Sequence, residues 1–424
     1  MFQQGLSLDQ APPISVPFRF FLSAPIFGIL LGLIFFLFPI DLIINRYSNV
    51  AIGAVHLFTL GILAQIIFGA MQQMMPVLAG ATIKRNKLFA NIVHGTLTLG
   101  TIFFTISFLF EIRELLIFGA ISLGISFLLF FGVAINLLFR VKYLTSTVKA
   151  MRIFAIAGIL TALVGLFLSF SHIILDIGLM HYIFVNIHML LGILGFAVIL
   201  IMGISFQVIP MFYVARNFPK FVQNNMPIVL AIVILFCIAF LLIGLDIYLF
   251  KLLITVILLV FSYYALNSLN NRKRPVFDVT LWYWKFSLYM FIFSMLSWLF
   301  IPQERPFDLA ILIGFGFLYS LLQGMVYKII PFLSWFHFSS KGYFSIPTMR
   351  EMINEDMIKL HFFLHVASVG FFIISAFLTN IFIYIGALLF ILSNMIFLLN
   401  CLTAVFKYNQ IAKTEAMQMA MPNK

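Results

Sequence analysis

Histidine is the residue type in this sequence best suited to chemistry inside an apolar environment. The chain contains eight histidines, and a neutral imidazole offers a lone pair that can bind a metal ion or the iron of a noncovalent haem. His56 and His188 begin two similar stretches, HLFTLGILAQ and HMLLGILGFA, each about twenty residues before a proline. His361 and His365 are spaced i, i+4 and therefore share one helix face. These four residues are the main candidate ligands, and His94 is a fifth.

Each candidate also has alternatives. A lone buried histidine is commonly hydrogen-bonded to a helix carbonyl and serves packing alone. The His361–His365 pair could clamp one metal ion or offer alternative ligands to one haem. The thioethers of Met71, Met74 and Met75 would suit copper(I), although methionines in an apolar helix more often fill gaps in the core.

A short signature occurs three times along the chain. GAMQQMMP (69–76), GISFQVIP (203–210) and GMVYKIIP (324–331) all follow the pattern G-x-x-x-[QK]-x-x-P, with Gln73, Gln207 and Lys328 at the polar position. Glycine permits close helix packing and proline often ends a helix, which is the alternative explanation. Three copies that share the polar position instead predict a triplicated four-helix unit. We expect Gln73, Gln207 and Lys328 to line the inner end of a cofactor site. Lys328 could extend to the membrane surface or neutralise a haem propionate or an anionic substrate.

Composition identifies the elements that carry these residues. The chain has 424 residues, of which 63% are hydrophobic and 9% charged, whereas soluble domains have about 25% charged residues. We therefore expect an all-α polytopic membrane protein with about 12 transmembrane helices, each near the roughly 20 residues that a span requires. The apolar runs lie at 17–40, 48–75, 88–110, 114–139, 151–171, 180–209, 226–245, 247–268, 281–301, 308–332, 357–378 and 380–405.

The signature and the apolar runs together predict one transmembrane domain built of three repeats in a pseudo-threefold arrangement. The repeats span approximately 17–139, 151–268 and 281–405. Lysine and arginine gather in alternate loops, which predicts that both chain ends lie in the cytoplasm. Because the basic residues lie in short loops, the net charge of +12 does not indicate nucleic-acid binding.

Other polar and reactive residues lie where structural roles are expected. All thirteen carboxylates fall in loops or at span ends, which argues against a proton pump or proton-coupled transporter with intramembrane acidic relays. Cys237 and Cys401 lie far apart in apolar runs, so we expect them to be structural. Trp282, Tyr283 and Trp284 are typical of an aromatic belt at the membrane interface.

Twelve spans in a threefold arrangement, with histidines on the second and sixth, resemble subunit I of the haem-copper oxidase superfamily, especially its divergent NnrS-like members. The architectural resemblance covers nearly the whole chain, but its motifs are specific only at 56–76 and 188–210. It implies that His56 is an axial ligand of a low-spin haem and that His188 lies on the copper side of the site. NnrS-like proteins are associated with haem and copper binding and with protection from nitrosative stress.

The sequence also departs from the oxidase pattern. The seventh span has no histidine pair, the tenth has no histidine ligands, and Gly192 stands where a tyrosine would be needed for oxygen reduction. These departures argue against a proton-pumping oxygen reductase and leave enzymatic activity open. We expect a haem b protein of the bacterial inner membrane, with copper as a second candidate, that handles a diatomic gas (NO or O2) or electrons with a redox partner. The alternatives are a small-solute or metal-ion transporter or channel, and a non-catalytic assembly or sensory protein.

Overall fold

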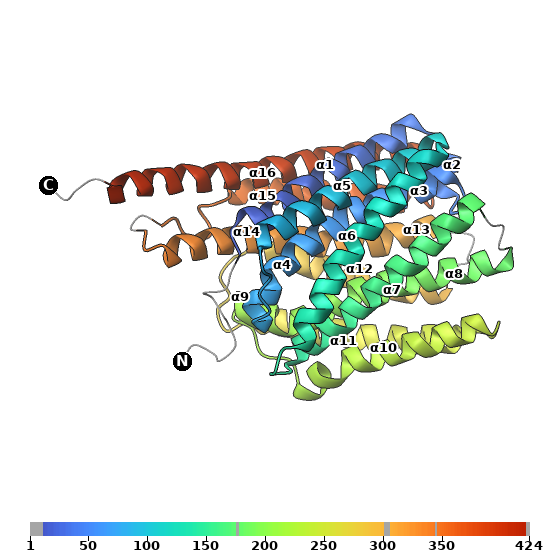
Figure 1. Cartoon of the computed structure of the whole chain (residues 1–424), viewed down its shortest axis with the longest axis horizontal. Coiled ribbons are helices and arrows are strands. Elements are labelled where there is room, and N and C mark those ends of the chain that lie inside the picture. Colours follow the sequence, from blue (N-terminus) through green and yellow to red (C-terminus); the bar gives the residue numbers. More distant parts are fainter. Residues whose placement is uncertain (1–11, 175–177, 301–305, 344–345, 421–424) are drawn as a thin grey trace.

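The protein is a bundle of long helices whose axes are roughly aligned (Figure 1). The structure is a computed structural model that describes residues 12–174, 178–300, 306–343 and 346–420. Within these residues, eleven helices are long and apolar enough to cross a membrane, and no strand occurs in the same described ranges. The expectation of an all-α, polytopic membrane protein is therefore confirmed.

Divided at the expected repeat boundaries, the helices form three consecutive blocks along the chain. The first block contains α1 (Ser15–Leu37), α2 (Ile40–Ile44), α3 (Asn49–Phe58), η2 (Thr59–Ala64), α4 (Gln65–Ala79), α5 (Asn86–Phe110) and α6 (Arg113–Phe139). The second contains α7 (Ser146–Ile174), α8 (Leu179–Met189), η3 (Leu190–Val198), α9 (Ile199–Tyr213), α10 (Lys220–Leu242) and α11 (Tyr248–Asn270). The third contains α12 (Thr280–Phe300), α13 (Pro306–Ala310), η4 (Ile311–Tyr319), α14 (Ser320–Ser340), α15 (Glu355–Ser375) and α16 (Ile381–Ala420).

The expected span at 281–301 forms a helix but is not among the eleven candidate spans. This helix, α12, has 21 residues and packs against α11, η4 and α14. It carries Lys285 together with serine, tyrosine and tryptophan residues, which lower its hydropathy. The other eleven expected runs each match one of the candidate spans.

The two ends of the described chain lie at the same end of the bundle. Figure 1 shows α1 starting, and α16 finishing, at this end, which we call the inner end. Asp9, Asp176 and Glu304 lie outside the described residues, and the other ten carboxylates lie in connections or near helix ends, as expected. The prediction that the inner end faces the cytoplasm rests on the distribution of lysine and arginine.

The three blocks are arranged in a closed ring. The last long helix of each block packs against the first helix of the next: α6 against α7, α11 against α12, and α16 against α1. Figure 1 shows the third of these contacts, with α16 and α1 side by side. Within each block, the last two helices also pack together: α5 with α6, α10 with α11, and α15 with α16.

A π-helical segment occurs at a corresponding place in each block. The segments η2, η3 and η4 each interrupt one long helix and lead into α4, α9 and α14. The three signature glycines each lie five residues after the last π-helical residue: Gly69 after Ala64, Gly203 after Val198, and Gly324 after Tyr319. The signature therefore begins at the same distance from the π segment in every block.

The signature glycines allow close contact with the first helix of the same block. A Cβ atom at Gly69, Gly203 or Gly324 would meet the Cβ atom of Phe20, Ala150 or Tyr283, respectively, closer than van der Waals contact permits. A second glycine, eight residues earlier in each copy, makes an equivalent contact seven residues further along the first helix. These pairs are Gly61 with Phe27, Gly195 with Ala157, and Gly316 with Met290. In its packing, Gly61 therefore corresponds to Gly195 of the second copy. The letters G-I-L that follow both His56 and His188 would instead align Gly61 with Gly192.

The expected aromatic belt at 282–284 is wrong for two of its three residues. Tyr283 and Trp284 are fully buried, and Trp282 is partly buried. Tyr283 contacts Gly324 of α14, and its hydroxyl bonds to groups of α15. Close helix packing around the third signature thus draws these side chains into the protein interior.

Candidate functional site

His56 and His188 come together at the start of two π-helical segments. His56 lies in the last turn of α3, just before η2, and His188 lies in the last turn of α8, just before η3. Their ring centroids are 6.2 Å apart, and the ring planes differ by 29°. π-helical turns inside α-helices are frequent at functional sites. The structure thus brings together the two histidines that the sequence paired by motif.

Backbone carbonyls orient both rings. Nδ1 of His56 donates a hydrogen bond to the carbonyl of Ile52 (2.8 Å), and Nδ1 of His188 donates one to the carbonyl of Thr161 (3.1 Å). A carbonyl can only accept, so Nδ1 carries the proton in each ring and Nε2 keeps its lone pair. Within the described residues Nε2 makes no hydrogen bond in either ring. Histidines that bind metals are commonly oriented in this way.

Side chains and backbone of neighbouring helices lie close to the two rings. Both are partly exposed, although both lie in apolar helices. The ring of His188 lies against Gly165 of α7, where a Cβ atom would be 2.9 Å from the imidazole Cε1. The ring of Phe104 lies 4.9 Å from that of His56. No cluster of three or more histidine, cysteine or acidic side chains that could hold a metal ion is found in the described part of the chain.

His361 and His365 form a second pair, in the third block. They are far from His56 and His188 in the sequence and, within the described residues, share no hydrogen-bond partner with them. Both are completely buried on α15, with ring centroids 6.4 Å apart. Nδ1 of His361 lies 2.8 Å from the hydroxyls of Tyr283 and Tyr327. Nε2 of His365 lies 2.8 Å from the hydroxyl of Ser320. One nitrogen of each ring is therefore occupied by protein groups.

His94 and His337 each have their own hydrogen-bond partners. His94 Nε2 lies 2.7 Å from the hydroxyl of Ser23, and this hydroxyl donates to the carbonyl of Arg19. His337 Nε2 donates to the carbonyl of Pro12 near the inner end. Among the hydrogen-bond and ring contacts of the described residues, His94 has no histidine neighbour, so it does not join His56 and His188. Its role in binding a cofactor stays a prediction.

The three polar residues of the repeated signature differ in their surroundings. Gln73 is buried, and within the described residues neither atom of its amide has a hydrogen-bond partner. Gln207 is partly buried. Lys328 forms an ion pair with Asp278, and its ammonium lies 5.1 Å from the ring centre of Tyr213. The positive charge predicted to meet a propionate or an anionic substrate thus already has a carboxylate partner.

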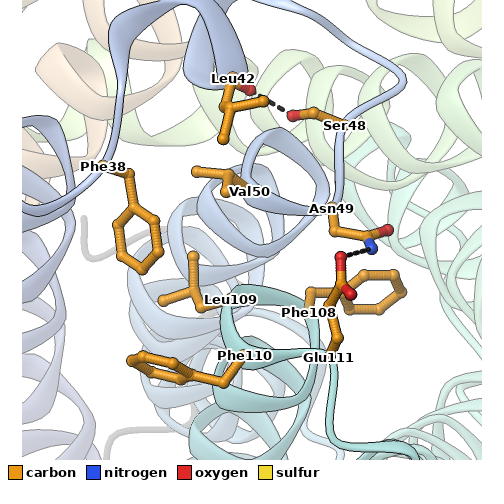
Figure 2. A pocket seen from close by; sticks show the side chains of 9 residues that line it. All are labelled: Phe38, Leu42, Ser48, Asn49, Val50, Phe108, Leu109, Phe110 and Glu111. Atoms are coloured by element: carbon orange, nitrogen blue, oxygen red, sulfur yellow. Dashed lines mark hydrogen bonds between the residues drawn. The ribbon is translucent and has the colours of Figure 1, made fainter.

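A hollow of about 340 Å³ opens at the outer end of the first block. Figure 2 shows that its wall is mainly apolar and that Asn49 donates a hydrogen bond to Glu111 (3.0 Å). Asn49 precedes His56 by seven residues on the same helical segment, or about 10 Å along the axis. The lining residues are Phe38, Leu42, Ser48, Asn49, Val50, Phe108, Leu109, Phe110 and Glu111.

The sequence did not identify the polar residues around His361 and His365. Ser320, Gln323 and Tyr327 are spaced three and four residues apart, so they lie on one face of α14. Asn394 and Asn400 are buried amides in the apolar helix α16. Helical spacing could have revealed the first group, but only the folded arrangement brings the second group to it.

Comparison with known proteins gives no match, either to a family model or to a characterised sequence. The resemblance to the haem-copper oxidases and to NnrS-like proteins is thus a prediction from the residues and their spacing.

Proposed function

We propose that this chain is a haem-binding protein of the bacterial inner membrane that carries electrons or handles a diatomic gas, with His56 and His188 as iron ligands. The approach of the two rings to 6.2 Å carries the proposal. Two imidazoles that each bind one shared metal through a bond of about 2.0 Å have ring centres up to about 6 Å apart, so His56 and His188 could hold the same metal.

The donor set fits this use. The carbonyls of Ile52 and Thr161 hold the Nδ1 protons, which fixes the tautomer and makes each Nε2 a better ligand. Bound haem would supply one-electron chemistry, and His56 and His188 would both hold its iron. Electron transfer is accordingly favoured over gas binding, and Phe104 and Gly165 would shape the space beside the rings.

The scaffold that we propose consists of three four-helix units at 17–139, 151–268 and 281–405, with twelve spans and both ends in the cytoplasm. Three observations support it: the recurring glycine contacts, the matching positions of the π segments and the closed order of the blocks. The plan agrees with a distant relationship to subunit I of the haem-copper oxidases and to NnrS-like proteins.

An optical spectrum of the protein purified from haem-replete cells tests the proposal. We expect a Soret band that weakens or shifts in His56→Ala and in His188→Ala. His337→Ala is the matched control, because its ring bonds to the backbone near the inner end, and it should leave the band unchanged. Adding carbon monoxide to the reduced protein separates the two uses, since a spectral shift would indicate gas binding. A well-folded, colourless wild-type protein would refute the haem proposal.

Copper is a second candidate because two neutral imidazoles at this separation also suit one copper ion. Metal analysis of the same samples distinguishes it from haem. One equivalent of copper, without a Soret band and absent from His56→Ala and His188→Ala, would assign the pair to copper. Metal or solute uptake into proteoliposomes by haem-free protein would instead favour a transporter.

A further inference from the structure

The His361–His365 pair leaves two buried nitrogen atoms without partners. Both side chains have no exposed surface. Within the described residues, Nε2 of His361 and Nδ1 of His365 have no hydrogen-bond partner. Buried polar atoms are nearly always hydrogen-bonded, to protein or to ordered water. The two atoms belong to side chains one helical turn apart on the same face of α15.

The partners of His361 determine which of its nitrogens carries the proton. Within the described residues, the Tyr327 hydroxyl has two hydrogen-bond partners: the Asn400 amide nitrogen (2.8 Å), which can only donate, and Nδ1 of His361, which is therefore the acceptor for the Tyr327 proton. The Tyr283 hydroxyl lies 2.8 Å from the same Nδ1 and 3.4 Å from the carbonyl of Ile358, and it can donate to either atom. All these groups are satisfied when Nδ1 of His361 accepts, and a neutral ring then carries its proton on Nε2. The unpartnered atom of His361 is therefore a donor.

The partners of His365 give the complementary result. Its Nε2 lies 3.2 Å from the carbonyl of Phe315 and 2.8 Å from the hydroxyl of Ser320. Ser320 itself donates to the carbonyl of Phe315 (3.0 Å). Because that carbonyl can only accept, Nε2 of His365 carries the proton, and Nδ1 keeps its lone pair. The unpartnered atom of His365 is therefore an acceptor.

We propose that a water molecule is bound between His361 and His365, accepting from Nε2 of His361 and donating to Nδ1 of His365. Two hydrogen bonds of about 2.9 Å that meet at a roughly tetrahedral angle place two ring centres up to about 6.6 Å apart, and the observed separation is 6.4 Å. A metal ion at this place would need a lone pair on Nε2 of His361, but that atom carries a proton, so water fits the pair and a metal ion does not. The site is independent of the cofactor proposed at His56 and His188.

Gln323 supplies further partners for the water. It lies three residues after Ser320 and four before Tyr327, on the face of α14 that meets both histidines. Its amide is completely buried, and both its nitrogen and its oxygen lack partners within the described residues. A buried water commonly has two to four polar partners, which the two rings and this amide can provide.

The water completes a chain of hydrogen bonds that all point the same way. Asn400 donates to Tyr327, Tyr327 to His361, and His361 to the water. The water donates to His365, and the chain ends through Ser320 at the carbonyl of Phe315, in η4. Aligned donors polarise and strengthen one another in a medium of low dielectric constant. Through the bound water, this chain of hydrogen bonds connects α16, α14, α15 and the π-helical segment η4.

Solid-state NMR of the full chain in lipid bilayers, with nitrogen-15 in its histidines, tests this proposal. We expect both rings to be neutral with the proton on Nε2, and the Nε2 proton of His361 to show a cross-peak with water. The cross-peak should disappear in His365→Leu, which removes the group that accepts a hydrogen bond from the water.

His94→Gln is the matched control, because the Nε2 atom of His94 is bonded directly to Ser23, and it should leave the cross-peak of His361 unchanged. If His365→Leu fails to fold, Gln323→Met should still weaken the cross-peak. A water cross-peak of equal intensity in His365→Leu, or its absence from the wild type, would overturn the proposal. One equivalent of a transition metal that is lost in His361→Gln would also overturn it.

Discussion

At the scale of single residues, the three copies of the signature share a position but not a charge. Gln73 and Gln207 are neutral, whereas Lys328 places an ammonium beside the middle of α14, where Asp278 is its ion-pair partner. Asp278 has further partners, because it accepts hydrogen bonds from the amide (3.0 Å) and the hydroxyl (2.7 Å) of Thr280. Without Lys328, the Asp278 carboxylate would still accept two hydrogen bonds from Thr280. Without Asp278, the Lys328 ammonium would lose its ion-pair partner.

This asymmetry predicts unequal effects of two substitutions. Lys328→Gln, which gives the third copy the residue of the other two, should lower the free energy of unfolding by less than about 1 kcal/mol. Asp278→Asn should cost about 1–3 kcal/mol, because it leaves a partly buried ammonium without its counter-charge. Side chains that are 21% and 20% exposed justify values below those of a fully buried pair. Thermal unfolding in detergent measures both, and a larger loss for Lys328→Gln would contradict the argument.

At the scale of elements, each signature glycine sets the distance between two helices. A methyl group at Gly203 would overlap the side chain of Ala150, so α7 and α9 would have to separate. Gly203→Ala should therefore cost about 1–3 kcal/mol, as overpacking typically does. Gly132 of α6 is the control, because a Cβ atom there meets nothing within 4 Å.

The control substitution is expected to have the opposite sign. Gly132→Ala should leave stability unchanged or raise it by about 0.5–1 kcal/mol, because alanine loses less backbone entropy than glycine in a helix. Thermal unfolding of the two variants under one set of detergent conditions provides the comparison. Equal stability of Gly203→Ala and Gly132→Ala would mean that α7 and α9 are not held at the distance described.

The sequence predicts the elements better than their interactions. The apolar runs, the signature and the pairing of His56 with His188 are local patterns of residue type and spacing, so they are visible without a structure. The π-helical segments are not, because they arise from a shift of backbone hydrogen bonds that no residue type specifies. The burial of Tyr283 and its bond to His361 depend on contacts between separate helices, which the letters W-Y-W at 282–284 do not reveal.

At the scale of the whole molecule, contact between α16 and α1 closes the ring of blocks. The two helices are in close contact at glycines of α1. A Cβ atom at Gly32 would overlap the side chain of Ile391, and one at Gly28 would overlap that of Asn394. Asn394 in turn accepts a hydrogen bond from Tyr319 (2.5 Å), in the π-helical segment of the third block. The contact that closes the ring is thereby joined to the buried centre of the third block.

Closure predicts that a disulfide can join the first and last helices. Cysteines introduced at Gly32 and Ile391 should oxidise readily, because disulfides need Cβ atoms about 3.5–4.5 Å apart and these side chains are in direct contact. Proteolytic cleavage in the connection between α11 and α12 should then leave two fragments that separate on a denaturing gel only after reduction. Gly32→Cys with Leu392→Cys is the matched control, since Leu392 is 40% exposed and lies one residue, about 100°, further around α16. Equal cross-linking of the two pairs, or none in either, would show that α1 and α16 do not close the ring as described.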